Sequence, residues 1–182
     1  MIEGRLVRLR AREASDAERG HRWVNDCEVA RFLVMRYPVS LTAEQGWIGS
    51  TPMPSFGWLP LAIETLDGEH IGNIDLRDVQ PENRTGEIGV MIGEKAYWGR
   101  GYGSDAVRTL ARLAFERMNL NRVWLRTYEF NERGQRAFLK AGFVVEGRMR
   151  RHLYNEGRYW DVIVMGMLRE EFEAGGTDTT QG

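Results

Sequence analysis

The residues with the clearest chemical potential form one glycine-rich segment, Trp98-Gly99-Arg100-Gly101-Tyr102-Gly103-Ser104. An apolar run precedes it, and apolar residues recur at three- and four-residue intervals over residues 107–118, which predicts strand, glycine loop and helix. The first N–H groups of a helix lack intrahelical partners and attract anions. Gly101 and Gly103 allow a phosphate to approach the backbone, and the Arg100 guanidinium suits phosphate oxygens. The segment therefore predicts a phosphate-binding site.

A dinucleotide site is one interpretation of these glycines. Gly101, Gly103 and Ala106 fit the G-x-G-x-x-G/A fingerprint, and Glu129 ends the next predicted strand, where a ribose-binding acid would lie. In that fold the first glycine follows its strand directly, whereas residues 94–100 intervene here, and repeated βαβ units are required. A Walker-type P-loop is excluded because G-K-[ST] is missing from the sequence. The dinucleotide interpretation is therefore the less favoured one.

The elements that must position this loop predict a mixed α/β (α+β) fold with a mostly antiparallel sheet. Alternating or continuous apolar runs predict about seven strands, and capping residues with helical periodicity predict about four helices. The strands are expected at residues 2–10, 58–65, 70–78, 87–93, 122–128, 143–149 and 159–168, and the helices at 16–25, 43–48, 104–118 and 131–141. Thr42 is the expected cap of the second helix, and residues 31–37 are ambiguous between helix and strand.

Composition limits the class of protein. The chain has 182 residues, of which 42% are hydrophobic, and this predicts a single domain over residues 1–173 with a disordered tail at 174–182. Residues 49–57 are expected to be an exposed, mobile loop. The net charge of −1 provides no bulk field for nucleic acid or anionic lipid. With one cysteine, Cys27, no internal disulfide is possible, and neither a signal pattern nor a membrane-length apolar run is seen, so a cytoplasmic location is expected.

Several segments taken together resemble the GNAT superfamily of N-acetyltransferases. Residues 100–103 are similar to the R-G-x-G core of that family, and Asn131, Phe138 and residues 141–143 are similar to its N-x7-(Y/F)-x3-GF segment. The segments GFVVEG at 142–147 and YWD at 159–161 resemble the branch that acetylates N-termini of ribosomal proteins and its polyamine-acetylating relatives. The resemblance extends from about residue 2 to residue 172.

This resemblance implies a GNAT-type sheet that splays between the fourth and fifth predicted strands, with acetyl-CoA as co-substrate and no metal. A backbone N–H near Met91 or Ile92, where the strand is expected to bulge, would polarise the thioester carbonyl. The pantetheine arm would pair like an extra strand, with Asn131 as a polar contact. The implied cofactor-binding residues are Met91, Ile92, Gly93, Trp98, Gly99, Arg100, Gly101, Tyr102, Gly103, Ser104, Asn131 and Phe138.

The attacking amine must lose a proton, and Glu87 is the candidate base. It lies thirteen residues before Arg100, the spacing at which histone-acetylating members place their catalytic glutamate. Glu146, His152 and Asp161 are weaker candidates, and catalysis by proximity with water as the base stays open. The acceptor would be a protein N-terminus, a polyamine or another small amine. The residues expected to line its face are in segments 36–58 and 154–160, with the aromatic side chains Tyr37, Trp47, Phe56, Trp58, Tyr159 and Trp160.

Three positions depart from the family pattern. Phe138 stands where many members have a tyrosine that protonates the leaving thiolate, Gly134 where some have serine, and Trp98 where glutamine or arginine is usual. A non-catalytic acyl-CoA-binding module is therefore the alternative to an enzyme. By analogy with the branch, a homodimer through the last strands is expected, and neither nucleic acid nor a membrane is expected as a partner.

Overall fold

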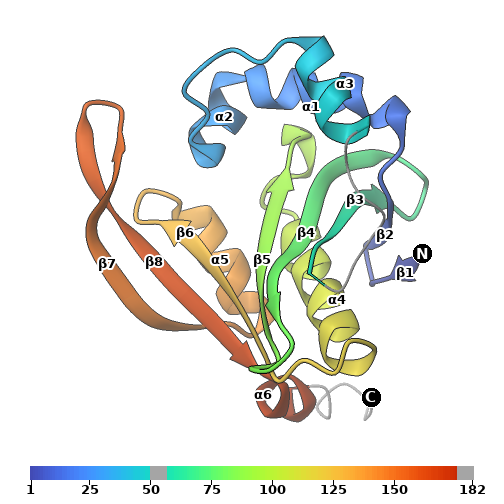
Figure 1. Ribbon diagram of the computed structural model, residues 1–182, viewed down its shortest axis with the longest axis vertical. Helices are drawn as coiled ribbons and strands as arrows, with labels where there is room; N and C mark the ends of the chain where they lie inside the picture. The colour runs from blue at the N-terminus through green and yellow to red at the C-terminus, as the bar shows by residue number, and fades with distance from the viewer. Residues whose placement is uncertain (50–56, 176–182) are drawn as a thin grey trace.

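The computed structural model describes residues 1–49 and 57–175, which form an eight-stranded sheet with six α-helices and two short 3-10 helices (Figure 1). The strands are β1 Ile2–Glu3, β2 Val7–Ala11, β3 Leu59–Thr65, β4 His70–Gln80, β5 Thr85–Ile92, β6 Arg122–Tyr128, β7 Val144–Asn155 and β8 Arg158–Leu168. The α-helices are α1 Ala17–Asn25, α2 Cys27–Leu33, α3 Leu41–Gly49, α4 Tyr102–Glu116, α5 Glu132–Ala141 and α6 Arg169–Ala174. The 3-10 helices are η1 Ala14–Asp16 and η2 Lys95–Tyr97.

The sheet has the mixed, mostly antiparallel character expected from the sequence. Its strand order is β1-β2-β3-β4-β5-β6-β8-β7, and within the described residues only β5 and β6 run parallel. A dinucleotide-binding fold needs repeated parallel βαβ units, so that interpretation of the glycine loop is wrong.

The single parallel contact opens after three residue pairs. Thr85 pairs with Arg122 and Glu87 with Trp124, after which β5 and β6 diverge, as Figure 1 shows. The predicted splay between these strands is therefore confirmed. The bulge expected near Met91 is wrong, because the β4–β5 register runs without a shift from Arg77 opposite Glu87 to Gly72 opposite Ile92. The shift lies at the other end, between Arg77 and Gln80.

Helices α4 and α5 pack side by side against the sheet, and α1 to α3 lie across its end (Figure 1). The 3.6-residue periodicity of α4 buries one apolar face completely, with Val107, Leu110, Ala111 and Ala114 in the core. Burial of a leucine of this kind contributes roughly 1.5–3 kcal/mol. This packing fixes the first turn of α4 beside the open end of β5.

Other differences from the predicted elements have local causes. The N-terminal strand is divided because the Asp105 carboxylate accepts N–H bonds from Arg5, Leu6 and Val7 at 3.2, 2.8 and 3.1 Å, which holds a turn there. Ser40, not Thr42, caps α3, with its Oγ 3.1 Å from the Ala43 nitrogen. Helices α2 and α6 were not predicted. Most of the predicted loop (49–57) and tail (174–182) falls on residues 50–56 and 176–182, which lie outside the described residues. At their described starts the predictions are wrong, because Gly49 ends α3 and Ala174 ends α6.

Candidate active site

The glycine loop ends in backbone conformations that favour glycine. Gly99 and Gly101 have φ of +72° and +91°, and Gly101 is the N-cap of α4. The first intrahelical bond runs from the Asp105 N–H to the Gly101 carbonyl at 3.0 Å. The N–H groups of the preceding helical residues therefore have no carbonyl partner within α4. Gly103 and Ser104 line a cavity of about 480 Å³, so the positive end of α4 opens into it.

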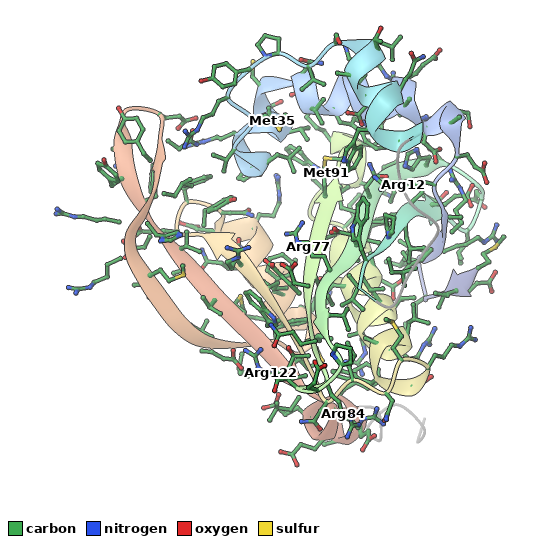
Figure 2. The ribbon with its side chains drawn as sticks, in the orientation of Figure 1. Arg12, Met35, Arg77, Arg84, Met91 and Arg122 are labelled. Carbon is green, nitrogen blue, oxygen red and sulfur yellow. The ribbon has the colours of Figure 1, made fainter. Side chains whose placement is uncertain are left out.

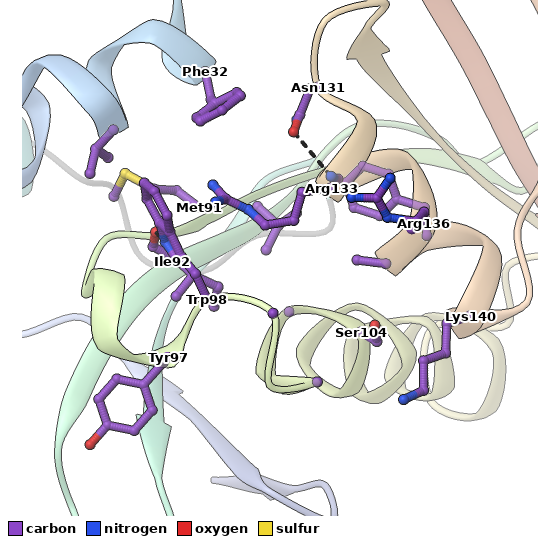
Figure 3. A pocket seen from close by; sticks show the side chains of 18 of the residues that line it. Phe32, Met91, Ile92, Tyr97, Trp98, Ser104, Asn131, Arg133, Arg136 and Lys140 are labelled. Atoms are coloured by element: carbon purple, nitrogen blue, oxygen red, sulfur yellow. Dashed lines mark hydrogen bonds between the residues drawn. The ribbon is translucent and has the colours of Figure 1, made fainter.

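This first cavity lies between the glycine loop, the end of β5 and α5 (Figure 3). Nine of the predicted cofactor residues line it, namely Met91, Ile92, Trp98, Gly99, Gly101, Gly103, Ser104, Asn131 and Phe138.

Three predicted cofactor residues are not among the residues that line this cavity. The Arg100 Nη1 donates to the Ala96 carbonyl at 3.3 Å, and Tyr102 stacks edge-on against Tyr97 at 4.8 Å. Gly93 is buried, and a Cβ there would lie 2.1 Å from the Trp23 ring. The structure therefore brings together most of the predicted set, but it turns the predicted cation Arg100 away from the cavity.

Three cations of α5 line the first cavity instead: Arg133, Arg136 and Lys140. Their spacing of three and four residues places them on one helix face, which is the sequence signal that could have identified them. The Arg133 guanidinium stacks 3.7 Å from the Trp98 ring centroid and 5.1 Å from that of Phe32, as Figure 3 shows. Burial lowers the pKa of Arg133. The cavity thus combines helix N–H groups with side-chain cations, an arrangement suited to a polyanionic ligand.

The open edge of β5 carries a backbone donor. Gly93 donates to the Ile71 carbonyl at 2.9 Å, and in an antiparallel pair alternate residues face the partner strand. Met91 therefore pairs with Asn73 on β4, whereas Ile92 directs its N–H and carbonyl to the open side. The Trp98 Nε1 donates to that carbonyl at 2.7 Å. Of the two predicted donors, the Ile92 N–H is the one that faces the gap.

Asn131 both caps α5 and lines the two cavities of the site. Its Oδ1 accepts the Gly134 N–H at 3.0 Å and caps α5, as Figure 3 shows. Its Nδ2 donates to Thr127 Oγ1 at 3.2 Å. In this position Asn131 lines the first cavity and also the second cavity, which is described next.

A second cavity, of about 600 Å³, opens on the far side of the β5 end, beneath α2 and α3. It shares six lining residues with the first: Phe32, Leu33, Val90, Met91, Asn131 and Phe138. The two cavities therefore meet beside the unpaired end of β5. Two of the aromatic residues predicted for the acceptor face, Trp47 and Trp58, line the second cavity. Three others do not, namely Tyr37, Tyr159 and Trp160. Phe56 lies outside the described residues.

Five charged side chains line the second cavity: Arg12, Glu44, Asp75, Arg77 and Arg126. None of them was singled out by the sequence patterns. Burial raises the pKa of the carboxyls of both Glu44 and Asp75, and it lowers that of Arg12. The Trp58 Nε1 donates to Asp75 Oδ2 at 3.1 Å.

Glu87, the predicted base, lies beneath this lining and borders neither cavity. Its side chain is 1% exposed, and its two oxygens accept bonds from Arg126 Nε and Nη2 at 2.9 and 3.1 Å. The weaker candidates also border neither cavity: Glu146 pairs with Arg122, Asp161 lies 2.7 Å from Arg148, and His152 is exposed on β7.

Two further features concern the described part of the chain as a whole. It contains no cluster of three or more His, Cys, Asp or Glu side chains placed to hold a metal ion. Its helices are all too short or too polar to span a bilayer.

A mostly antiparallel sheet that parts at β5, with a glycine-capped helix and two joined cavities at the opening, defines the acyl-coenzyme A-dependent transferase class that the sequence resembles. Residues 6–144 match the family model described as the acetyltransferase (GNAT) domain. The chain belongs to the GNAT acetyltransferase family.

The chain is also similar to individual N-acetyltransferases. The chain is 36% identical over 107 residues to "Putative ribosomal N-acetyltransferase YdaF" of Bacillus subtilis, an alignment that covers 59% of this chain and 58% of that protein. It is 24% identical over 174 residues to spermidine N(1)-acetyltransferase of Escherichia coli, covering 96% of this chain and 92% of that protein. The crystal structure of Vibrio cholerae spermidine N-acetyltransferase in complex with CoA and spermine shares the fold, with a TM-score of 0.82 at 21% identity over 92% of this chain and 98% of that one.

Proposed function

We propose that this protein is an N-acetyltransferase that uses acetyl-CoA and a primary amine in a ternary complex. The observation that carries the proposal is the meeting of the two cavities at Val90, Met91, Asn131 and Phe138. One cavity has the helix N–H groups and cations that a diphosphate requires, and the other has room for an acceptor. Two substrates that enter from opposite sides would meet there, which supports direct transfer without a covalent enzyme intermediate.

The residues of the first cavity fit the cofactor. When bound, acetyl-CoA supplies the acetyl thioester. The N–H groups at the start of α4, with Arg133, Arg136 and Lys140, would hold its phosphates, and Gly101 and Gly103 leave space for them. The Ile92 N–H would stabilise negative charge on the carbonyl oxygen, a contribution of roughly 3 kcal/mol for one oriented donor. The parted strands leave the edge of β5 free to pair with an extended chain.

Two carboxylates are candidates for the base. Asp75 lines the acceptor cavity, and burial raises the pKa of its carboxyl, which improves proton acceptance near neutral pH. Glu87 retains the role implied by its spacing, and the Arg126 bond would then have to open, or water would have to relay the proton. Asp75 needs neither change, and we infer that it is the stronger candidate.

The acid that protonates the leaving thiolate is a separate question, because Phe138 carries no proton donor. Tyr128 lines the acceptor cavity, as Phe138 does, and burial raises the pKa of its phenol, which keeps it protonated at neutral pH. Tyr128 therefore replaces Phe138 as the candidate acid in this proposal.

Release of free thiol from acetyl-CoA, measured with a panel of primary amines, tests the proposal. Turnover with at least one amine supports it. Tight CoA binding with no turnover on any amine would favour the non-catalytic module, and failure to bind CoA would overturn both interpretations. The relatives' names point the panel to spermidine and to protein N-termini. Cytoplasmic location and a homodimer stay predictions.

A further inference from the structure

Gly89 lets two side chains of β4 cross over β5 toward the acceptor cavity. A Cβ at Gly89 would lie 2.3 Å from Asp75 Oδ1 and 3.0 Å from Arg77 Nη1. Both side chains pass over this position because glycine leaves it empty, and both line the second cavity. Figure 2 shows Arg77 in the opening between β5 and β6, below Met91.

Arg77 meets Arg126 over one shared carboxylate. Arg126 forms its two bonds to Glu87, and the Arg77 Nε lies 3.6 Å from Glu87 Oε2. The side chains of Arg77 and Arg126 are 43% and 45% exposed, whereas Glu87 is 1% exposed. The carboxylate is therefore underneath and the two guanidinium groups face the cavity. Asp75 also pairs with Arg77, so two carboxylates balance the two guanidinium groups, and what the pair offers a ligand is the N–H groups that these contacts do not use.

The remaining contacts leave donors available. Within the part of the chain that the structure describes, neither Arg77 Nη2 nor Arg126 Nη1 has a hydrogen-bond partner. Asp75 engages one further donor, since its Oδ2 lies 3.5 Å from Arg77 Nη1. The pair therefore presents guanidinium N–H groups of the kind that bind carboxylate or phosphate oxygens.

We propose that Arg77 and Arg126 bind an anionic oxygen group of the acceptor, so that the substrate is a primary amine with a carboxylate or phosphate a few bonds from its nitrogen. This inference rests on the proposed function. Asp75, next to Arg77, supplies the negative pole for the ammonium group. The apolar side chains of the second cavity, among them Val24, Met35 and Leu125, accommodate the rest of the molecule.

A polyamine fits this lining poorly. Spermidine would bring additional ammonium groups to a cavity whose wall exposes the guanidinium groups of Arg12, Arg77 and Arg126 beside the carboxylates of Glu44 and Asp75, while Glu87 lies beneath Arg77 and Arg126. Like charges facing each other in a partly enclosed site act against binding.

Matched acceptor pairs that differ by one anionic group test the inference. We expect kcat/KM to be about fivefold higher for phenylalanine than for phenethylamine, and for phosphoethanolamine than for ethanolamine, because a partly exposed ion pair contributes up to about that factor. The two pairs separate carboxylate from phosphate. Calorimetric titration of phenylalanine and phenethylamine into the CoA-saturated protein gives a binding readout that is independent of turnover.

Arg77→Gln should lower the ratio of phenylalanine to phenethylamine, in both affinity and kcat/KM, about fivefold. The ratio is the readout because Arg77 also contacts Asp75, and an effect on Asp75 would change both substrates alike. Arg126→Gln should do the same, and turnover of phenethylamine shows that each variant is folded. Arg122→Gln is the control, because Arg122 lies on the same strand as Arg126 but borders neither cavity.

Two results would overturn the inference. One is an equal loss of kcat/KM for both acceptors of a pair in the Arg77 and Arg126 variants, and the other is a preference of the unmodified protein for the acceptor without the anionic group. Thiol release would in either case still support an acetyltransferase. Absence of turnover and of CoA binding would instead remove the proposed function, and the inference with it.

Discussion

Asp75 and Glu87 are both buried carboxylates, but they differ in what they can reach. Asp75 borders the acceptor cavity, whereas Glu87 is covered by two guanidinium groups. As a base, Asp75 must be deprotonated, and burial raises its pKa, so kcat/KM should fall as pH decreases through that raised pKa.

Asp75→Asn should remove this pH dependence and reduce kcat by about a hundredfold, the usual contribution of one general base. Glu87→Gln is the comparison. It should lower the affinity for carboxylate-bearing acceptors, because Arg126 loses the carboxylate that holds it in position. The acidic limb of the pH profile should remain. Loss of that limb in Glu87→Gln, with retention in Asp75→Asn, would return the role to Glu87.

The phosphate-binding cations can be tested in the same way. Arg133→Ala should raise the KM for acetyl-CoA about tenfold, because it removes both a cation and the stack on Trp98 in the first cavity. Arg100→Ala should change it little, because Arg100 bonds to the Ala96 carbonyl instead. Steady-state kinetics with a saturating amine measures both. The reverse order of effects would show that Arg100 moves to the phosphates when the cofactor binds.

At the residue scale, the sequence predicted what depends on local pattern. Gly101 and Asn131 were found because a helix start and an N-cap need particular residue types. Asp75 and Arg77 were missed because they reach the cavity only by crossing a neighbouring strand at Gly89, a contact between residues distant in sequence. A glycine inside a strand was the available signal, since it often marks a close approach.

At the element scale, a buried carboxylate joins β2 to the helices above the acceptor cavity. Asp16 in η1 accepts two bonds from Arg10, each of 2.8 Å, and the His70 Nδ1 lies 3.2 Å from its Oδ1. Burial alone would raise the pKa of Asp16, but the bonds from Arg10 and His70 outweigh burial and hold it far below its usual range.

Because the folded pKa of Asp16 is depressed, its stabilising contribution is present above the unfolded pKa and is lost as pH falls below it. Asp16→Asn should therefore destabilise the protein by about 3 kcal/mol at pH 7, since it removes the closer of the two carboxylates that pair with Arg10. Thermal unfolding at pH 7 and at about pH 3 measures this. The difference in Tm between the two proteins should shrink at the lower pH. A difference of the same size at both values would show that lost packing, not charge, is responsible.

The strand and helix pattern was predictable where periodicity is strong, as in α4 and β6. It was not predictable where a distant side chain sets the boundary. Asp105 divides the N-terminal strand from a position about a hundred residues away, and no local propensity reports that bond. The splay between β5 and β6 was predicted from the family resemblance and not from local pattern. The structure shows where it begins, because the last paired residue of β5 is Glu87.

At the scale of the whole molecule, the sheet ends in a long unpaired edge. Strand β7 has twelve residues, pairs only with β8 among the described strands, and exposes Val144 and Val145, the latter by 56%. These two valines make the start of the strand apolar, whereas Arg148, Arg150 and Arg151 follow, and an unpaired edge of this length can pair with another chain. This supports the predicted homodimer through the last strands.

Light scattering after size-exclusion chromatography should therefore give twice the chain mass. Val145→Lys should shift the protein to the monomer, because a charge at an apolar edge has to be desolvated on pairing. Leu66→Lys is the matched control, an exposed apolar residue in the turn between β3 and β4, and it should leave the dimer intact. A monomer at every concentration of the unmodified protein, or a dimer that survives Val145→Lys but dissociates with Leu66→Lys, would place the interface elsewhere. Because β7 borders neither cavity, loss of the dimer should leave CoA binding unchanged, and calorimetry on the monomeric variant measures this directly.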